Sequence, residues 1–286
     1  MTSVGKILEE KGFLLAPGVY DALSAKIAER AGFEALFVSG YSVAASVLGE
    51  PDVGLLTQTE VIDAARRICR AVDRPVIVDA DTGYGGILNV TRTVRELIAA
   101  GAKGCFLEDQ VWPKRCGHMR GKKTVPPAEH ARKIRAACAA RDGADFFIVA
   151  RTDAREATGS LADAIGRARE YKNAGADALF VEAPQSRDEL ETIARELTPP
   201  FVANMLEGGV TPILAGDELK KLGFKIAVFP LTGLFAAARA QQEIFEHLRR
   251  TGTTADVLDR LLTFHDFHQI VELEGHYALD RRFGSD

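Results

Sequence analysis

The chain has 286 residues, of which 47% are hydrophobic and 27% are charged, an ordinary balance for a globular protein. Its formal net charge of −4 argues against bulk attraction to nucleic acid or to an anionic membrane, so an anionic ligand must be bound by local positive charge. The sequence shows no signal-peptide pattern and no apolar run of the roughly 18 residues that a membrane span needs. Four irregularly spaced cysteines favour a reducing compartment, so we expect a cytoplasmic protein without nucleic-acid or membrane partners.

Short apolar runs alternate with longer helical patterns along the chain. The runs are continuously apolar, which is typical of parallel strands buried on both faces. Eight such units predict a single (β/α)₈ barrel domain over residues 1–286, because a barrel of this type needs about 250 residues. The predicted strands are Leu14–Ala16, Ala35–Val38, Pro75–Asp79, Gly104–Leu107, Phe146–Ala150, Ala178–Val181, Phe201–Ala203 and Lys225–Phe229.

Amphipathic stretches between these strands predict the outer helices. Several end in Ala-Gly, as at Gly32, Gly101 and Gly175, where glycine accepts the left-handed conformation that stops a helix. A further helix is predicted over 231–248, and about 250–286 is predicted to be a helical extension beyond the barrel. The clearest amphipathic stretches are Thr59–Ala71, Val90–Ala100, Leu161–Ala174 and Glu189–Leu197.

Polar residues stand at the carboxyl end of most predicted strands. Barrel enzymes place their catalytic groups at this end, so the pattern indicates one active site rather than a solvated surface. These residues are Ser39, Asp79, Asp81, Glu108, Arg151, Glu182 and Asn204.

Asp79 and Asp81 form the best candidate metal site. Two carboxylates separated by one residue at a strand end can converge on a hard cation, and Mg²⁺ prefers one or two carboxylates with waters and substrate oxygens. Glu108, at the end of the next strand, is placed to hold a metal-bound water. The alternative is that Asp81 caps a helix that follows it.

The segment from Gln110 to about Pro127 is too long for an ordinary connection, and we predict a mobile active-site loop. Its Lys114-Arg115-Cys116-Gly117-His118 stretch is basic in an acidic protein. Positive neighbours favour the thiolate form of a cysteine, which tunes Cys116 for proton transfer. A solvated basic loop or a nucleic-acid patch are the alternatives. Zinc binding by Cys116 and His118 is not favoured, since no second ligand pair is near in sequence.

Two further patterns resemble functional motifs without matching them. The stretch 83–86, Gly-Tyr-Gly-Gly, lacks the spacing of a dinucleotide-binding fingerprint, and we interpret it as a tight turn beside the metal site. A set of residues spaced three to four apart on a predicted helix is more typical of a packing face than of a metal site. The set is His265, His268, Glu272 and His276.

The combined order of these motifs resembles the isocitrate lyase and phosphoenolpyruvate mutase superfamily over nearly the whole chain. The resemblance covers residues 17–25, 38–41 and 48–52, and continues through 79–85, 108–118, 150–154, 181–183 and 203–205.

This resemblance implies an α/β barrel whose last helix is swapped between subunits of a homodimer or homotetramer. It also implies Mg²⁺, or sometimes Mn²⁺, held by Asp79 and Asp81, with Glu108 acting through water. The carboxylate of a 2-oxo or 2-hydroxy acid would be held by Ser39, Gly40, Tyr41 and Arg151. The same substrate pocket would also be lined by Asp52, Gly117, His118, Glu182 and Asn204.

The Lys-Arg-Cys-Gly-His loop is typical of the lyase side of the superfamily, and implies retro-aldol cleavage of a C–C bond. In that mechanism Tyr41 removes the hydroxyl proton, Arg151 and His118 stabilise negative charge, and Cys116 protonates the new carbanion. Lys114, from the same loop, completes the expected catalytic set.

The expected substrate is 2-methylisocitrate or a 2,3-dimethylmalate-type diacid, cleaved to pyruvate or a related 2-oxo acid plus a carboxylate. Methylisocitrate lyases continue the loop as Arg-Pro-Asn-Lys, whereas residues 119–122 here are Met-Arg-Gly-Lys, which favours the smaller diacid. A carboxyphosphonoenolpyruvate-type mutase is the alternative from another reaction class. Oxaloacetate hydrolases favour serine where this chain has Pro230, and a binding protein without chemistry would not be expected to keep the whole catalytic set.

Overall fold

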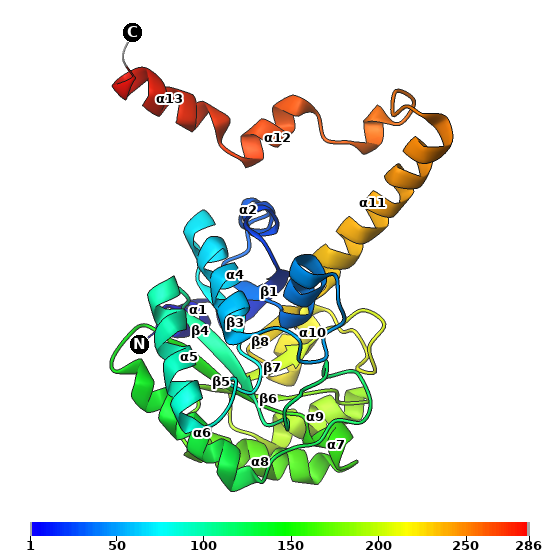
Figure 1. The fold of residues 1–286 in the computed structure, drawn as a ribbon. Coiled ribbons are helices and arrows are strands. Elements are labelled where there is room, and N and C mark those ends of the chain that lie inside the picture. Colours follow the sequence, from blue (N-terminus) through cyan, green and yellow to red (C-terminus); the bar gives the residue numbers. More distant parts are fainter. Residues whose placement is uncertain (1, 285–286) are drawn as a thin grey trace.

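The computed structural model describes residues 2–284, and its centre is a closed barrel of eight parallel strands (Figure 1). The strands follow one another in chain order, and the last pairs with the first. This confirms the predicted (β/α)₈ fold, and every predicted strand overlaps an observed one. The strands are β1 (Leu14–Val19), β2 (Leu36–Val38), β3 (Val76–Asp79), β4 (Gly104–Glu108), β5 (Phe147–Thr152), β6 (Ala178–Val181), β7 (Phe201–Asn204) and β8 (Ile226–Phe229).

Helices cover the outside of the barrel, and the four clearest amphipathic predictions are confirmed as α4, α5, α8 and α9. The predicted Ala-Gly endings are also confirmed, since Gly32, Gly101 and Gly175 have φ of 93°, 100° and 107°. The helices of the barrel are α2 (Ala22–Arg30), α3 (Gly40–Val43), the π-helix η1 (Ala44–Leu48), α4 (Gln58–Ala71), α5 (Ile87–Ala100), α6 (Pro127–Arg141), α7 (Ala154–Ala157), α8 (Leu161–Asn173), α9 (Arg187–Glu196) and α10 (Gly216–Leu222).

Apolar side chains fill the barrel interior and the layer between the strands and the helices. Near the carboxyl ends of the strands, Phe106 packs against Phe37 and Phe180, with ring centroids 4.8 and 5.6 Å apart. At the opposite end, α1 (Ser3–Lys11) inserts the fully buried Val4 among the inward-facing residues. The interior is therefore a solid core, and only its carboxyl end is available for a site.

The seam between the first and last strands is unusually tight at Gly18. A Cβ atom there would lie 2.0 Å from the carbonyl oxygen of Pro230, so only glycine fits. The same carbonyl oxygen accepts a 3.0 Å hydrogen bond from Ser42 Oγ. The backbone just after β8 is therefore held from two sides.

The chain leaves the barrel after β8 as an extended C-terminal arm, which we define as residues 232–283 (Figure 1). It begins with α11 (Thr232–Thr251), which confirms the predicted helix over 231–248, and α11 projects away from the barrel. The short helix η2 (Leu258–Arg260) is followed by α12 (Phe264–Ile270) and α13 (Leu273–Phe283). The predicted helical extension is thus confirmed as far as it is described, while residues 285 and 286 lie outside the described residues.

The arm returns towards α2, where polar contacts hold it. Lys26 Nζ lies 2.6 Å from Glu272 Oε2, and Arg30 Nη1 donates a 2.9 Å hydrogen bond to the carbonyl oxygen of Gln269. Within residues 2–284, no helix has the length and hydropathy needed to cross a membrane.

Candidate active site

A pocket opens at the carboxyl ends of the strands, where the sequence predicted it. Three of the predicted residues lie beside the pocket rather than on its wall: Gly40, Asp81 and Glu108. Gly40 borders the acids, since a Cβ there would lie 3.1 Å from Asp79 Oδ2. The other predicted residues line the pocket: Ser39, Tyr41, Asp52, Asp79, Lys114, Cys116, Gly117, His118, Arg151, Glu182 and Asn204.

Two acids, one in the loop after η1 and one just after β3, meet the ammonium group of Lys114. Lys114 Nζ lies 2.6 Å from Asp52 Oδ1 and 2.6 Å from Asp81 Oδ1, and all three side chains are buried. Burial raises the pKa of Asp81 to about 7, against the opposing effect of Lys114. Burial also raises the pKa of Asp79 and of Glu108. The cluster therefore carries more buried acid than one lysine neutralises.

Asp81 does not cap a helix, so that alternative is wrong. Helix α5 begins at Ile87 and its N-cap residue is Gly86, five residues further along. The intervening stretch is a tight turn, as predicted, with φ of 80° at Gly83 and 59° at Tyr84. Asp81 itself has a φ of 48°, and this left-handed backbone turns its carboxylate towards Lys114.

The donor set at the cluster fits a hard divalent cation. Glu108 Oε1 and Tyr84 Oη are buried and have no hydrogen-bond partner in the described part of the chain. Within residues 2–284 no three His, Cys, Asp or Glu side chains converge closely enough to form a complete metal cage. Mg²⁺ does not need one, since two carboxylates with waters and substrate oxygens satisfy it.

Arg151 is the centre of a second group of charges, on β5 and β6. Its guanidinium donates two 2.9 Å hydrogen bonds to Asp153, one to each carboxylate oxygen. It also lies 3.4 Å from Glu108 Oε2 and 3.6 Å from Glu182 Oε2. Arg151 lowers the pKa of Glu182, which stays ionised despite its burial. A fixed, charged guanidinium of this kind suits recognition of a substrate carboxylate.

Residues 110–126, which we call the lid, cover both groups of charges. Its two ends are tied together, because Val111 N donates to Lys123 O at 2.7 Å and Val125 N donates to Asp109 O at 2.8 Å. Inside the lid, the side-chain amide of Gln110 bonds the backbone N–H and carbonyl of Arg115. The lid is therefore an ordered loop, whereas its predicted mobility is untested.

The tip of the lid packs directly onto the second group of charges. A Cβ atom at Gly117 would lie 2.4 Å from Arg151 Nη2 and 2.5 Å from Glu182 Cδ, so this position requires glycine. His118 Nδ1 accepts a 3.0 Å hydrogen bond from Val210 N, which leaves the ring proton on Nε2, 2.8 Å from Glu182 Oε1. Asn204 Nδ2 donates to the same oxygen at 3.1 Å.

The expectation that positive neighbours make Cys116 a thiolate is wrong. Burial raises the pKa of Cys116 to about 11, and Asp52 and Glu182 add to that rise. Lys114, the cation expected to lower it, is committed to Asp52 and Asp81 instead. The thiol is consequently protonated near neutral pH, which suits a proton donor rather than a nucleophile.

Tyr41 also has a raised pKa, chiefly because it is partly buried. It follows Gly40 in α3, whose N-cap Ser39 accepts a 3.3 Å hydrogen bond from Ser42 N. The phenol is therefore protonated at neutral pH and positioned as a hydrogen-bond donor.

In the part of the arm that the structure describes, the histidines are not grouped with other His, Cys, Asp or Glu side chains in a way that could hold a metal ion. Glu272 is paired with Lys26, and the His268 ring packs against Phe264 with centroids 4.0 Å apart.

Sequence reasoning missed several residues of the site. Asp153 lies two residues beyond Arg151, so the strand-end rule would have reached it. Lys122 was noticed only as part of a basic run, although its side chain is fully buried. The remaining pocket residues are apolar and give no signal in the sequence: Phe37, Phe180, Leu206, Val228 and Leu231.

A closed parallel barrel that gathers acids, an arginine and a loop cysteine at one end defines an α/β-barrel enzyme. A family model described as phosphoenolpyruvate phosphomutase matches residues 5–249. The chain belongs to the phosphoenolpyruvate mutase and isocitrate lyase superfamily, whose named members are lyases, mutases and hydrolases, and a carbon–carbon lyase fits this group.

Three curated relatives are similar over nearly their whole length. The petal death protein of Dianthus caryophyllus is 53% identical, with 99% of this chain and 89% of the relative covered. The chloroplastic carboxyvinyl-carboxyphosphonate phosphorylmutase of Arabidopsis thaliana is 50% identical, with 99% and 85% covered. The 2,3-dimethylmalate lyase of Eubacterium barkeri is 44% identical, with 96% and 97% covered.

Solved structures agree with this assignment. A crystal structure of 2,3-dimethylmalate lyase has a TM-score of 0.92 and 36% identity, with 100% of this chain and 96% of that chain covered. A phosphonopyruvate hydrolase in complex with oxalate and Mg²⁺ has a TM-score of 0.88 and 28% identity, with both chains covered completely. The 2,3-dimethylmalate lyase is named for a small carboxylate, and the phosphonopyruvate hydrolase structure contains oxalate and Mg²⁺.

Proposed function

We propose that this chain cleaves a C–C bond of a small 2-hydroxy dicarboxylate of the 2,3-dimethylmalate type, giving a 2-oxo acid such as pyruvate and a carboxylate. The observation that carries the proposal is the protonated thiol of Cys116 on the pocket wall, on the same lid that packs against Arg151. A carbanion formed in this pocket would meet an acid rather than bulk water.

The choice of a diacid rests on where the pocket has charge and where it has none. The cations on its wall are Arg151 and Lys114, and His118 adds an Nε2–H donor. The wall also has an apolar part, formed by Leu206, Pro230 and Leu231. This part suits alkyl substituents and offers no cation for a third carboxylate, so 2-methylisocitrate is a poorer fit than a dimethylmalate-type diacid.

The cofactor proposed for this reaction is Mg²⁺, with Asp79 and Asp81 as ligands and Glu108 acting through water. When bound, Mg²⁺ would supply the positive charge that lowers the pKa of the substrate hydroxyl. Because Tyr41 is protonated, we assign it hydrogen bonding to the substrate carboxylate, together with Ser39 and the Gly40 backbone, rather than the role of base. The hydroxyl proton passes instead to the acidic cluster around Lys114.

The next step is cleavage of the C–C bond, in which Arg151, His118 and Cys116 take part. The C–C bond breaks, its electron pair stays on the carbon of the departing carboxylic acid, and the hydroxyl carbon becomes a ketone. Arg151 and His118 face the negative charge that develops, while Glu182 and Asn204 orient these side chains and Asp52 holds Lys114. Asp52, Glu182 and Asn204 also line the pocket around the substrate. Cys116 donates its proton to the carbanion, and water later restores the thiol.

A second candidate is a phosphonomutase, because the Arabidopsis relative carries the name of one at 50% identity. An oxaloacetate hydrolase is disfavoured by Pro230, which presents a ring rather than a hydroxyl to the pocket.

The oligomer that we propose is a homodimer or homotetramer in which α11 packs on the barrel of a neighbouring copy. In support, α11 leaves its own barrel, and along its 20 residues only His247 is buried.

The test is a coupled assay for released 2-oxo acid with Mg²⁺ and a panel of 2-hydroxy di- and tricarboxylates, on wild type and Cys116→Ser. We expect metal-dependent release from a dimethylmalate-type diacid that falls by a factor of about 10³ in the variant. A matched control is Cys69→Ser, which should keep full activity. Turnover of a carboxyphosphonate without free pyruvate would identify a mutase, and ligand-induced stabilisation without turnover would identify a binding protein.

A further inference from the structure

Lys122 is a buried cation to which the proposed reaction gives no role. It lies on the returning part of the lid, and its side chain has no exposed surface. Its neighbour Lys123 is exposed, so burial is particular to this one lysine of the pair. A lysine is buried at this level only when its ammonium group is fully compensated.

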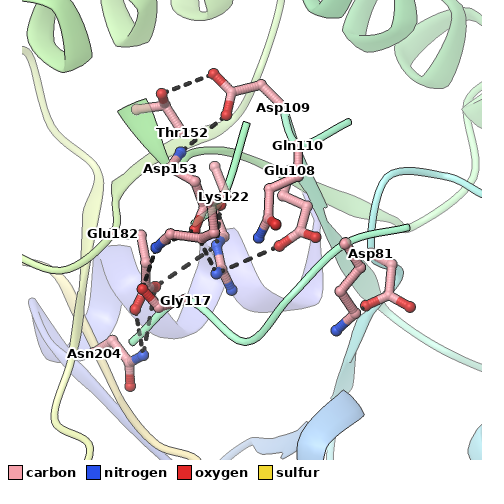
Figure 2. A network of polar contacts seen from close by, with 12 residues as sticks. Asp81, Glu108, Asp109, Gln110, Gly117, Lys122, Thr152, Asp153, Glu182 and Asn204 are labelled. Atoms are coloured by element: carbon pink, nitrogen blue, oxygen red, sulfur yellow. Dashed lines mark hydrogen bonds and ion pairs between the residues drawn. The ribbon is translucent and has the colours of Figure 1, made fainter. Parts of the chain in front are cut away.

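Two groups compensate this charge, one within the lid and one on the barrel. Lys122 Nζ donates a hydrogen bond to the carbonyl oxygen of Gly117, at the tip of the lid. The same Nζ lies 3.1 Å from Asp153 Oδ1, beyond the end of β5 (Figure 2). Lys122 therefore connects the lid tip to the barrel through a single ammonium group.

Asp153 is also the residue that holds Arg151. Its Oδ1 atom faces Lys122 Nζ and accepts from Arg151 Nη2, while Oδ2 accepts from Arg151 Nε. Asp153 is itself fixed from behind, because its backbone N–H donates a 2.9 Å hydrogen bond to Asp109 Oδ1. One immobile carboxylate thus orients both the pocket arginine and the lysine that holds the lid.

The geometry points to Lys122 as a positioning residue that holds the lid closed. Through Gly117 it keeps Cys116 and His118 over the pocket, and through Asp153 it ties lid closure to the orientation of Arg151. Without Lys122 the lid tip keeps its packing on Arg151 and the contact of His118 with Glu182, but it loses the hydrogen bond from the ammonium group to Gly117. Cys116 then becomes accessible to solvent more often.

The inference builds on the proposed function, but its test does not need a substrate. The probe is iodoacetamide, and the measurement is the alkylation rate of Cys116 in the intact enzyme, followed by mass spectrometry of its peptide. Cys138, which lies on α6 outside the lid, serves as the internal reference. A merely structural defect would speed both cysteines, whereas lid opening speeds Cys116 alone.

Lys122→Met should raise the Cys116 rate about tenfold or more while leaving Cys138 unchanged, because a hydrogen bond to a charged group is lost. Lys123→Met is the matched control and should leave both rates within about twofold of wild type, a change too small to reflect loss of such a bond. Lys122→Arg should restore much of the protection by keeping the charge.

Equal Cys116 rates in Lys122→Met and Lys123→Met would overturn the inference, as would a parallel rise at Cys138. If Lys122→Met does not fold, Lys122→Gln carries the same test, since its amide can reach the carbonyl but brings no charge to Asp153. If wild type released no pyruvate but Cys116 alkylation still depended on Lys122, only the proposed function would be contradicted, and the role of Lys122 would stand.

Discussion

The pocket and the C-terminal arm are opposites in what they bury. The pocket takes charged side chains out of water, such as Lys114 and Arg151, and compensates each of them within one chain. The arm leaves large apolar side chains in water, with Phe245, Phe264 and Phe283 exposed to 63%, 81% and 73%. One region pairs its charges within a single chain, whereas the other leaves apolar surface that the proposed oligomer would cover.

In the proposed oligomer, this difference would separate the properties that depend on a second copy from those that do not. Buried ion pairs contribute specificity of geometry rather than large stability. Each charged side chain of the pocket therefore needs the oppositely charged residue with which it is paired. Exposed apolar area of this extent on an arm is typical of a protein–protein interface. Binding of metal and substrate should therefore follow the barrel, while the arm should govern assembly.

The largest expected effect is at the acidic cluster. Asp81→Asn removes a proposed metal ligand and one of the two carboxylates paired with Lys114, so we expect 2-oxo acid release to fall by at least about a hundredfold. The wild-type protein should gain about 2.7 kcal/mol of stability at Mg²⁺ concentrations near 100 times Kd, and the variant should gain almost none. Thermal melts with and without EDTA measure this.

Asp63→Asn is the matched control for that experiment. Asp63 is paired with Arg66 on the surface of α4 and should not change the Mg²⁺-dependent shift. A full Mg²⁺ shift in Asp81→Asn would mean that the cation binds elsewhere.

A smaller effect is expected at the arm. Phe245→Asp places a charge on α11 where a fully buried Phe would contribute about 1.5–3 kcal/mol, so the particle mass should fall towards that of one chain. Sedimentation at several concentrations measures the mass. Ala162→Asp introduces the same charge at an exposed position of α8 and should leave the mass unchanged. An unaltered mass in Phe245→Asp would remove the arm from the interface.

The effect that is smallest at neutral pH concerns the acid stability of the barrel, which does not depend on the pocket or on the arm. Burial and the neighbouring Lys133 lower the pKa of His130, on α6, to about 3. Since an unfolded histidine titrates near pH 6.5, the unfolded state binds the extra proton between about pH 6.5 and 3. Stability is therefore complete above pH 6.5 and is lost as the pH falls through this window.

In His130→Leu that loss should be shallower by up to about 1.4 kcal/mol per pH unit within the window. Denaturant unfolding at pH 7, 5.5 and 4 measures the slope. A slope identical to that of wild type would show that other groups determine acid lability.

The sequence predicted the barrel well because its signals are local. Continuous apolar runs and Ala-Gly endings report the strands and helices directly, and the strand-end rule placed Asp79, Glu108 and Arg151 on one rim. The residues of the lid were predicted to join that rim, and Cys116, Gly117 and His118 do so.

What the sequence did not reveal is how the charges pair. Lys114 meets Asp52 and Asp81, which are 62 and 33 residues away in the chain, and this pairing leaves Cys116 without the cation that a basic loop predicts. Burial then dominates the pKa of the thiol, and no local pattern reports burial of a loop residue. The direction of α11 is hidden for a similar reason, because an amphipathic helix does not specify which copy of a barrel it covers.

The tight seam at Gly18 has a consequence for altering this enzyme. The carbonyl of Pro230 is pinned by the bare backbone of Gly18 and by the hydroxyl of Ser42, so the main chain at this corner cannot easily drift. A new side chain at position 230 would therefore project into the cavity from the same anchor point as the proline ring. The side chain at position 230 can therefore be exchanged, in evolution or by design, without changes to the backbone that carries it.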